Sequence, residues 1–410
     1  MVDVPVPRVT GVHVRQLANL RLVRDIGCES HALVFSTAGR PYDPAGMAAV
    51  CDGATHAGAR VEYSGLGIWK RVSLRLRMAT AAILRQPSST YPFSIPYDLA
   101  GLAPKTCAEA ARVHADFVVL PTSLLHIAPV LRSQGVRVIG DALDVLSELT
   151  LGFLKQEARR NPLRVPGLVV NYLASRRQED LFLAACTELW AASDDDAAEL
   201  ARKAPQTNVL VCGNTFDEQE IIPTDPPANG TIGFIGTYTY RPNLDAATFL
   251  ALEVLPLVHQ HRPEARLLLA GGGMPATVAD TLRVVPGVQL LGTVNDSAAF
   301  VGSCALMALP IRLRGGVPLK LLESMACGRP IVATPELVAG LALVPGRDLL
   351  VSADPQGFAE HVTQLLTSAA VGTTLARNAR SRFVDEFSYG AMLRRARDHS
   401  VLRTSAPLTQ

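Results

Sequence analysis

The chain has 410 residues, of which 48% are hydrophobic and 19% charged, and its formal net charge is +2. This composition excludes a disordered chain, and the length predicts two domains of roughly 200 residues each. A nearly neutral chain lacks the strongly basic surface that nucleic-acid binding requires, so we expect no nucleic-acid partner.

The seven cysteines are widely spaced and contain no C-x-x-C pair. Their scatter indicates buried thiols in a reducing compartment, and it argues against a disulfide framework or a structural zinc site. No apolar run reaches the ~18 to 20 residues of a membrane span, and residues 1–9 do not resemble a signal peptide. We therefore expect a cytoplasmic protein, with any membrane contact peripheral to the inner face.

The first half alternates short apolar strands with helices. It opens with a strand over residues 2–6, a helix over 12–25 and a strand over 31–35, and Gly11 directly precedes that helix. Further strands are expected at 117–121, 136–140, 188–192 and 209–212. Helices are expected at 126–133, 146–161, 168–185 and, after a Ser193 cap, 194–203.

Two features of this half suggest chemistry and also have plainer explanations. Residues 69–85 alternate basic and apolar side chains, a pattern that fits both a helix lying on an anionic membrane and the solvated face of a core helix. Asp141 and Asp144 follow the strand at 136–140. A carboxylate there fits a catalytic or substrate-orienting role, and Asp144 fits a helix N-cap equally well.

Residues 213–230 are rich in proline and acidic side chains, and we place a domain linker there. The second half then repeats strand, glycine-bearing loop and helix, which predicts a doubly wound parallel sheet. Its strands are expected at 231–235, 266–270, 288–291, 305–309, 330–333 and 349–351. Its helices are expected at 244–261, 277–283, 297–302, 318–327 and 355–367, before a basic helical tail over 376–403.

Three glycine-bearing loops, at Gly236, at 271–273 and at 315–316, fall at the carboxyl ends of these strands. Ligands of α/β proteins bind at such ends, so we expect the three loops to converge on one crevice. The alternative for each loop is an ordinary turn, in which glycine allows the chain to reverse and binds no ligand.

The stretch from Ala305 to Thr334 carries the sharpest pattern. Arg312 and a glycine pair precede a helix in which Pro318 suits the first position, and Gly328 suits the position just past the end. Lys320 and Glu323 are three residues apart and should share a face. An inward stripe of Leu319, Leu322 and Ala326 is expected. A basic loop that leads into a helix N-terminus predicts an anion site.

Four segments together carry a family resemblance: 234–250, 267–273, 288–296 and above all 309–334. The chain resembles the retaining GT-B glycosyltransferases of family 4, the glycosyl transferases group 1. The first half matches more loosely, through Gly11 with the helix after it and through residues 141–148. The resemblance implies an α/β GT-B fold, with two facing Rossmann-like doubly wound domains and a crossing C-terminal helix.

In that family's terms, residues 1–210 form the acceptor-side domain and 211–385 the nucleotide-sugar-binding domain. Residues 386–410 are a helix that packs back on the N-terminal domain. The resemblance implies that Lys320 and Arg312 bind the diphosphate of the donor and that Glu323 binds its ribose. The full implied donor-binding set is Gly11, Gly236, Tyr240, Gly272, Val294, Arg312, Gly315, Gly316, Val317, Lys320 and Glu323. The implied catalytic set is Lys320, Asp144 and Arg241.

The chain departs from the family pattern at several positions. Gly315 stands where many members have the first of two glutamates, and Leu143 stands where many have a histidine. Arg241 replaces the usual arginine and lysine of the loop after Gly236, and Pro318 removes one amide donor. The first departure leaves recognition of the transferred sugar unassigned.

The sequence therefore predicts a retaining glycosyltransferase with a nucleoside-diphosphate sugar as co-substrate and with no metal or other cofactor. Its expected acceptor is a glycan, a lipid-linked sugar or a natural product. One alternative is a catalytically silent GT-B protein that binds a nucleotide sugar or partners an active enzyme. A dinucleotide oxidoreductase also fits the strand and helix order, but the chain lacks G-x-G-x-x-G with its downstream acid.

Overall fold

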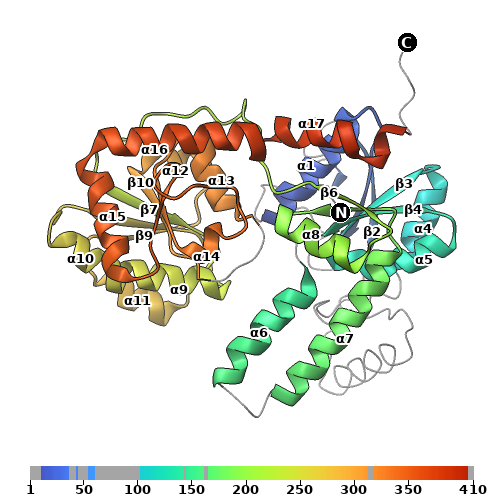
Figure 1. The fold of residues 1–410 in the computed structure, drawn as a ribbon, viewed down its shortest axis with the longest axis horizontal. Coiled ribbons are helices and arrows are strands. Elements are labelled where there is room, and N and C mark those ends of the chain that lie inside the picture. Colours follow the sequence, from blue (N-terminus) through green and yellow to red (C-terminus); the bar gives the residue numbers. More distant parts are fainter. Residues whose placement is uncertain are drawn as a thin grey trace. The chain divides into compact units, whose positions relative to one another are not determined.

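A computed structural model describes residues 11–36, 43–44, 54–60, 102–142, 145–160, 165–312 and 317–404. By internal contacts the chain divides into unit 1, Met1–Gly213 with Leu393–Gln410, and unit 2, Asn214–Met392. Both units are α/β structures (Figure 1). Several expectations fall outside the described residues: the strand at 2–6, the basic segment 69–85, Leu143, Asp144, Gly315 and Gly316.

Unit 1 contains two parallel sheets. One pairs β1 (His31–Ser36) with β2 (Thr55–Arg60). The other has the order β3-β4-β5-β6, so its strands follow one another along the chain. These four strands are Phe117–Pro121, Arg137–Ala142, Glu188–Ala191 and Asn208–Val211. The strands expected in the described part of this half are confirmed to within a residue or two.

The helices of unit 1 are α1 (Gly11–Asp25), α4 (Leu102–Arg112), the 3-10 helix η2 (Thr122–Ile127), α5 (Ala128–Ser133), α6 (Leu146–Arg160), α7 (Val165–Ala184) and α8 (Asp194–Lys203). Most of them also follow the sequence pattern, but α4 was not predicted, and the helix expected over 126–133 is divided between a 3-10 helix and an α-helix. Ser193 caps α8 as predicted, because its Oγ accepts a hydrogen bond from the backbone N–H of Asp196. The core between sheet and helices includes Leu120, Val138, Phe182 and Leu189.

A fully buried carboxylate fastens the end of the chain to this sheet. Glu188 of β5 accepts from Trp190 Nε1 at 2.7 Å and from Asn208 Nδ2 at 2.6 Å. It also accepts from Ser400 Oγ at 2.7 Å and from the backbone N–H of Val401 at 2.9 Å. These four donors satisfy the carboxylate. They fix the junction between α17 (Tyr389–His399) and η6 (Val401–Thr404) in unit 1.

Unit 2 is built on one six-stranded sheet with the order β9-β8-β7-β10-β11-β12, and all its pairs are parallel. The strands are β7 (Thr231–Ile235), β8 (Arg266–Ala270), β9 (Val288–Gly292), β10 (Leu306–Leu309), β11 (Ile331–Ala333) and β12 (Leu350–Val351). Counted from β7, this is the doubly wound order 3-2-1-4-5-6. The order reverses between β7 and β10, so their carboxyl ends are where a ligand is expected.

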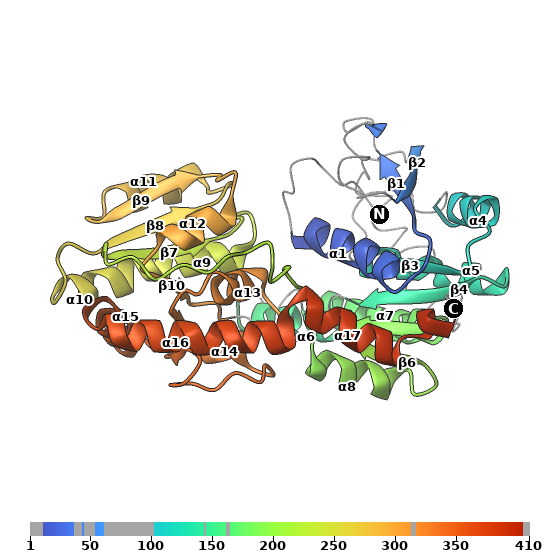
Figure 2. The same ribbon diagram turned by 90° about the horizontal axis from the view of Figure 1, so that it is seen from above.

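Helices cover both faces of this sheet (Figures 1 and 2). On one face lie α9 (Arg241–Phe249), the π-helical η4 (Leu250–Val254), α10 (Leu255–His259), α11 (Ala276–Arg283) and α15 (Pro355–Thr367). On the other lie α12 (Ser297–Ser303), α13 (Leu319–Ala326), α16 (Ala369–Arg382) and the π-helical η5 (Phe383–Phe387). The first layer is fixed in part by an edge-to-face contact between Phe249 and Phe358, whose ring centroids are 5.9 Å apart.

The single helix expected over 244–261 is wrong in two respects. It begins earlier, at Arg241, with Pro242 in its first turn, where a missing N–H costs nothing. It then widens into the π-helical η4 directly before α10, which carries Pro256 near its start. Proline in a helix interior cannot donate to the preceding turn, and a local π segment accommodates that loss.

The segment after Gly213 is fastened to unit 2 by two arginines. Arg329 is fully buried and donates to Thr224 Oγ1 at 2.6 Å and to the carbonyl of Asp225 at 3.1 Å. Arg380 donates to the carbonyls of Glu218 at 2.7 Å and Ile221 at 3.2 Å. Residues 214–229, expected as a linker, therefore pack against the domain that follows them.

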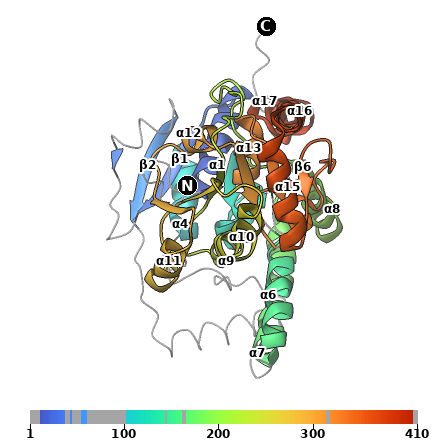
Figure 3. The same ribbon diagram turned by 90° about the vertical axis from the view of Figure 1, so that its left-hand side faces the viewer.

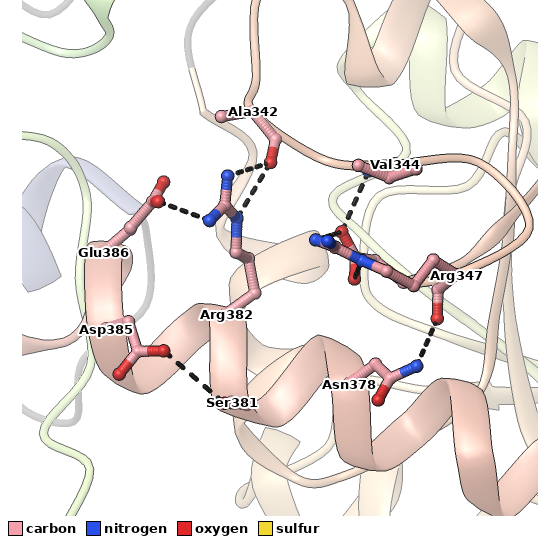
Figure 4. Close-up of polar contacts among 9 residues, drawn as sticks. Ala342, Val344, Arg347, Asn378, Ser381, Arg382, Asp385 and Glu386 are labelled. Atoms are coloured by element: carbon pink, nitrogen blue, oxygen red, sulfur yellow. Dashed lines mark hydrogen bonds and ion pairs between the residues drawn. The ribbon is translucent and has the colours of Figure 1, made fainter.

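A second long connection, between β11 and β12, is tied to α16 (Figure 4). It includes the short helix α14 (Pro335–Val338). Arg382 donates from Nε to the carbonyl of Ala342 at 2.8 Å and pairs with Glu386 at 2.6 Å. Asn378 donates to the carbonyl of Arg347 at 2.8 Å. The helical tail thus positions a loop that leaves the carboxyl end of β11.

No helix within the described ranges combines the length and the apolar character needed to cross a bilayer.

Candidate functional site

The loops after β7, β8 and β9 are bonded to one another at the carboxyl edge of the sheet in unit 2. The N–H of Tyr238 donates to the carbonyl of Gly272 at 2.9 Å, and the N–H of Gly271 donates to the carbonyl of Gly292 at 2.7 Å. Gly271 has φ +126°, and a Cβ there would lie 1.9 Å from the carbonyl oxygen of Gly236. Only glycine fits that position. Two of the three loops expected at one crevice are therefore in contact.

The helix of the central motif, α13, starts one residue later than expected. Pro318 is its N-cap, with extended backbone at φ −70° and ψ 126°, and no side chain caps the helix. The first N–H groups of a helix lack intrahelical partners, so this end favours an anion. Gly328 at φ +66° directly follows the C-cap Cys327, as predicted.

Lys320 lies in the first turn of α13 with its amine turned toward β7. Its Nζ donates to Asn243 Oδ1 at 2.5 Å and lies 4.5 Å from the ring centroid of Phe234. No ion pair reaches this amine from any part of the chain that the structure describes. Burial without a carboxylate disfavours the charged form, and it lowers the pKa of Lys320 to about 7.

The partner of Lys320 is held by the loop after β7. Asn243 Nδ2 donates to the carbonyl of Thr237 at 2.9 Å, which leaves Oδ1 for the lysine. A Cβ at Gly236 would lie 2.7 Å from that Nδ2. Gly236 therefore acts by making room for the amide of Asn243. The sequence pattern did not assign Asn243 this role, because its distance from Lys320 along the chain gives no sign of the contact.

Glu323, one turn farther along α13, faces a different neighbour. Its side chain is 6% exposed, and its Oε1 accepts a hydrogen bond from Ser297 Oγ of α12. Burial raises the pKa of Glu323 to about 7, the Ser297 hydroxyl opposes that rise, and the charge of Asp296 adds to it. Lys320 and Glu323 thus point to β7 and to α12, and no ion pair joins these two described residues. No pattern in the sequence pointed to Ser297.

The inward face of α13 is wider than the expected stripe. Leu322 and Ala326 are fully buried, as predicted, but Leu319 is only half-buried. Leu321 and Met325 are buried as well. The helix is covered on two sides, by the sheet and by α12 and α16, so more than one row of side chains packs inward.

The other residues of this unit that were predicted to bind the donor have different partners. Val317 is buried, and its carbonyl accepts from Asn214 Nδ2 at 2.7 Å. The guanidinium of Arg312 lies 4.0 Å over the ring centroid of Phe249, so that side chain stacks on a ring. Val294 is half-buried just beyond β9.

Tyr240 and Arg241 form the start of α9. Tyr240 is the N-cap and is 50% exposed, and Arg241 is the first helical residue. Arg241 also lies 4.0 Å from the carboxylate of Asp245, with both side chains mostly exposed. Both residues are near the Gly236 loop, but the contacts of Arg241 are those of a surface pair.

In unit 1, Asp141 at the end of β4 has a structural partner. Its carboxylate accepts from Arg15 Nε at 2.8 Å and from Asn19 Nδ2 at 2.8 Å, and all three side chains are buried. Arg15 and Asn19 belong to α1, so the pair fastens that helix to the carboxyl edge of the sheet. Gly11 is the first residue of α1.

Among the residues that the structure describes, no three His, Cys, Asp or Glu side chains lie close enough together to hold a metal ion.

Residues 229–368, which include Lys320 and Glu323, match the family model described as glycosyl transferases group 1. The match is confined to these residues of the 410-residue chain, so it is this part of unit 2 that is similar to the family. Solved structures agree on the fold. HepE from Anabaena, in complex with UDP and glucose, superimposes with a TM-score of 0.64 at 13% identity, covering 97% of each chain. Sucrose-phosphate synthase from Thermosynechococcus elongatus gives 0.65 at 17% identity, covering 97% of this chain and 94% of that one. The fold is that of the GT-B glycosyltransferases.

Two curated proteins are similar to parts of this chain. The phosphatidyl-myo-inositol mannosyltransferase of Propionibacterium freudenreichii is 29% identical over 196 residues, 46% of each protein. A GDP-mannose-dependent monoacylated alpha-(1-6)-phosphatidylinositol monomannoside mannosyltransferase of Corynebacterium glutamicum is 26% identical over 152 residues, 34% of this chain and 40% of that protein. The matched region therefore spans less than half the length of these relatives.

Proposed function

We propose that this chain is a retaining, metal-independent glycosyltransferase that moves a hexosyl or related sugar from a nucleoside-diphosphate sugar to a hydroxyl acceptor. One observation carries the proposal. The amine of Lys320 is held on a neutral amide at the N-terminus of α13, next to the strand where the sheet order reverses. A cation placed there without a carboxylate is suited to an incoming anion.

The chemistry of the leaving group explains why such an amine is useful. Cleavage of the anomeric bond leaves negative charge on the nucleoside diphosphate. A fixed donor aimed at that charge stabilises the transition state, often by ~3 kcal/mol for a single donor. A bound diphosphate also favours the charged amine, so the pKa of Lys320, about 7 in the free protein, rises on binding. We expect donor binding to take up a proton near neutral pH.

Glu323 is assigned to the ribose of the same donor. Its buried carboxyl group, which Ser297 holds in place on α13, offers oxygen acceptors to the two hydroxyls of a diol. The loops that carry Gly272 and Val294 follow the neighbouring strands, and we assign them to the nucleoside. This arrangement separates the two roles: Lys320 toward β7 for phosphate, Glu323 toward α12 for sugar hydroxyls.

The acceptor and the site of action are part of the proposal. The two curated relatives carry names of mannosyltransferases that act on phosphatidylinositol lipids. These names favour a hexose donor and a glycan or lipid-linked acceptor, handled at the cytoplasmic face of the membrane. We propose that the positive charge for the leaving group comes from Lys320 and the α13 amides, so chelation with EDTA should leave the transfer rate unchanged.

A thermal-shift panel with UDP, GDP, dTDP and their sugars tests the donor site first, since a ligand that binds only the folded state raises the melting temperature. Transfer is then measured with the donor that binds, and NMR of the product anomer tests retention. Lys320→Ala and Glu323→Ala should abolish transfer in folded protein. Arg283→Ala and Glu253→Ala, exposed positions on α11 and η4, serve as controls.

Full activity in both site variants would overturn the assignment. Donor binding without any turnover, across lipid and glycan acceptors, would favour the catalytically silent alternative.

A further inference from the structure

Within the described residues, a single side chain hydrogen-bonds the carboxyl group of Glu323, and it belongs to another helix. Helices α12 and α13 lie beside each other in unit 2 (Figure 3). Ser297, the first residue of α12, donates from its Oγ to Oε1 of Glu323. The thiol of Cys327 also donates to the carbonyl of Ala298 at 3.7 Å, so the two helices are joined at a second point. The orientation of the Glu323 carboxyl group therefore depends on α12 as well as on its own helix.

The start of α12 does not need the Ser297 hydroxyl. The N-cap of this helix is Asp296, whose Oδ1 accepts a hydrogen bond from the backbone N–H of Ala299 at 2.9 Å. Ser297 follows the cap, and its Oγ donates to Glu323 instead. Because the helix is capped without it, the hydroxyl of Ser297 serves the carboxyl group and not the helix end.

The contact divides the acceptor sites of the carboxyl group between the protein and a ligand. An ionised carboxyl group has about four lone-pair sites on its oxygens. The Ser297 hydroxyl occupies one of them on Oε1, and no other part of the chain that the structure describes donates to this group. The side chain of Glu323 is buried, so little water can reach the remaining sites. A ligand hydroxyl that donates there therefore satisfies a buried acceptor.

Two physical effects make Ser297 useful for binding such a ligand. A glutamate side chain has several rotatable bonds, and a hydrogen bond to one oxygen restricts the direction of the other. Burial raises the pKa of Glu323 to about 7, and the Ser297 hydroxyl opposes this rise, so it favours the ionised form. An ionised carboxyl group only accepts hydrogen bonds, and each hydroxyl of a diol can donate one. Ser297 thus prepares Glu323 for a pair of donors.

We propose that Ser297 is a positioning residue that makes Glu323 selective for a nucleoside diphosphate whose ribose carries both hydroxyls. The inference rests on the proposed function, because it requires Glu323 to face the ribose. A deoxyribose leaves one acceptor of a buried carboxylate without a donor, and such a site rejects an analogue that lacks the hydroxyl. Deoxyribonucleotide donors, such as dTDP-sugars, should therefore be poor ligands of this chain.

Isothermal titration calorimetry of the full chain measures this selectivity directly. The probes are UDP, GDP and their 2′-deoxy and 3′-deoxy forms. We expect the parent to bind the better ribonucleotide about tenfold more tightly than its weaker deoxy form, the order that a hydrogen bond to a charged group provides. Ser297→Ala should lower this ratio to about twofold. Ser297→Thr keeps the hydroxyl and should retain the ratio of the parent.

Ser303→Ala is the matched control, because Ser303 is exposed at the other end of α12 and its Oγ donates to the carbonyl of Phe300 at 2.7 Å. This variant should keep both the affinity and the ratio. In a Glu323→Ala background, Ser297→Ala should leave the ratio unchanged, because Ser297 acts through Glu323. Circular dichroism checks that every variant is folded.

A ratio in Ser297→Ala equal to that of the parent would overturn the inference, because a merely structural serine changes the affinities for ribose and deoxyribose alike. Equal binding of the ribose and deoxyribose forms by the parent would overturn it as well, with the proposed function left standing. A further loss of the ratio when Ser297→Ala is added to Glu323→Ala would refute the positioning role and make Ser297 a direct ligand contact. A parent that binds neither UDP nor GDP would overturn the proposed function and this inference together.

Discussion

Lys320→Met tests whether the buried amine lowers the free energy of unfolding when no ligand is bound. Methionine keeps the length and apolar stem of the side chain but removes its charge. The lysine pKa of 10.5 falls to about 7 in the folded state. At about 1.36 kcal/mol for each pKa unit, this difference corresponds to a cost on the order of 5 kcal/mol while the amine is charged.

The shifted pKa of Lys320 determines whether stability rises or falls with pH. Below about pH 7 the amine is charged in both folded and unfolded chains, so the folded state bears the full cost. As the pH rises from about 7 to 10.5, the unfolded chain holds a proton that the folded chain does not, and stability increases. Above that range the cost is gone.

We therefore expect Lys320→Met to raise the stability of unit 2 at pH 6 by about 1–4 kcal/mol, the range seen when buried charge is replaced by apolar groups. The lost hydrogen bond to Asn243 and imperfect packing account for the difference from the full cost. The gain should fade toward pH 10. Nucleoside-diphosphate binding should weaken at least tenfold in the same variant.

Scanning calorimetry at pH 6, 8 and 10, with and without the nucleotide that binds best, provides the measurement. Lys105→Met, at an exposed position of α4, is the control for removal of a lysine charge. A variant that is less stable than the parent at pH 6, or a gain that does not depend on pH, would refute the reasoning. Either result would mean that Asn243 and solvent satisfy the charged amine.

Glu323→Gln should remove a pH dependence of stability that is opposite in sign to that of Lys320. The pKa of Glu323 is about 7 in the folded protein and 4.5 ordinarily, so the stability that this group contributes below pH 4.5 is lost as the pH rises through 7. Calorimetry should show that decline in the parent and not in the variant. Gly236→Ala should lower nucleotide affinity at least tenfold by titration calorimetry, because its Cβ would displace the Asn243 amide that holds the lysine. Asp141→Asn should destabilise unit 1 by about 3–5 kcal/mol, since it leaves the Arg15 guanidinium buried without its carboxylate; an unchanged melting temperature would show that the pair contributes little.

The order of strands and helices could be predicted from the sequence because it depends on local periodicity. The helix at Pro355–Thr367 and the strand at Arg266–Ala270 match their expected bounds. The motifs that carry the family resemblance led to Lys320 and Glu323 as donor-site residues, and this assignment stays a prediction. Where proline and tertiary packing compete with periodicity, the expectations failed, as in the helix that starts at Arg241 and widens before Pro256.

The partners of the site residues could not be predicted, because they come from distant parts of the chain. Asp141 meets Arg15 across 126 positions, and Lys320 meets Asn243 across 77. A spacing of three placed Lys320 and Glu323 on one face of α13. Side-chain direction then separated them, because the helix packs against β7 on one side and α12 on the other.

Buried cations elsewhere in the described residues show what is unusual about Lys320. Arg15 has the carboxylate of Asp141, and Lys203 has that of Glu179 at 3.0 Å. Arg329 lacks a carboxylate but donates to several backbone carbonyls. Lys320 has three donor hydrogens and, within the same residues, one oxygen acceptor, Asn243 Oδ1. Burial lowers the pKa of this amine in the free protein. The oxygens of a diphosphate would satisfy its remaining donor capacity.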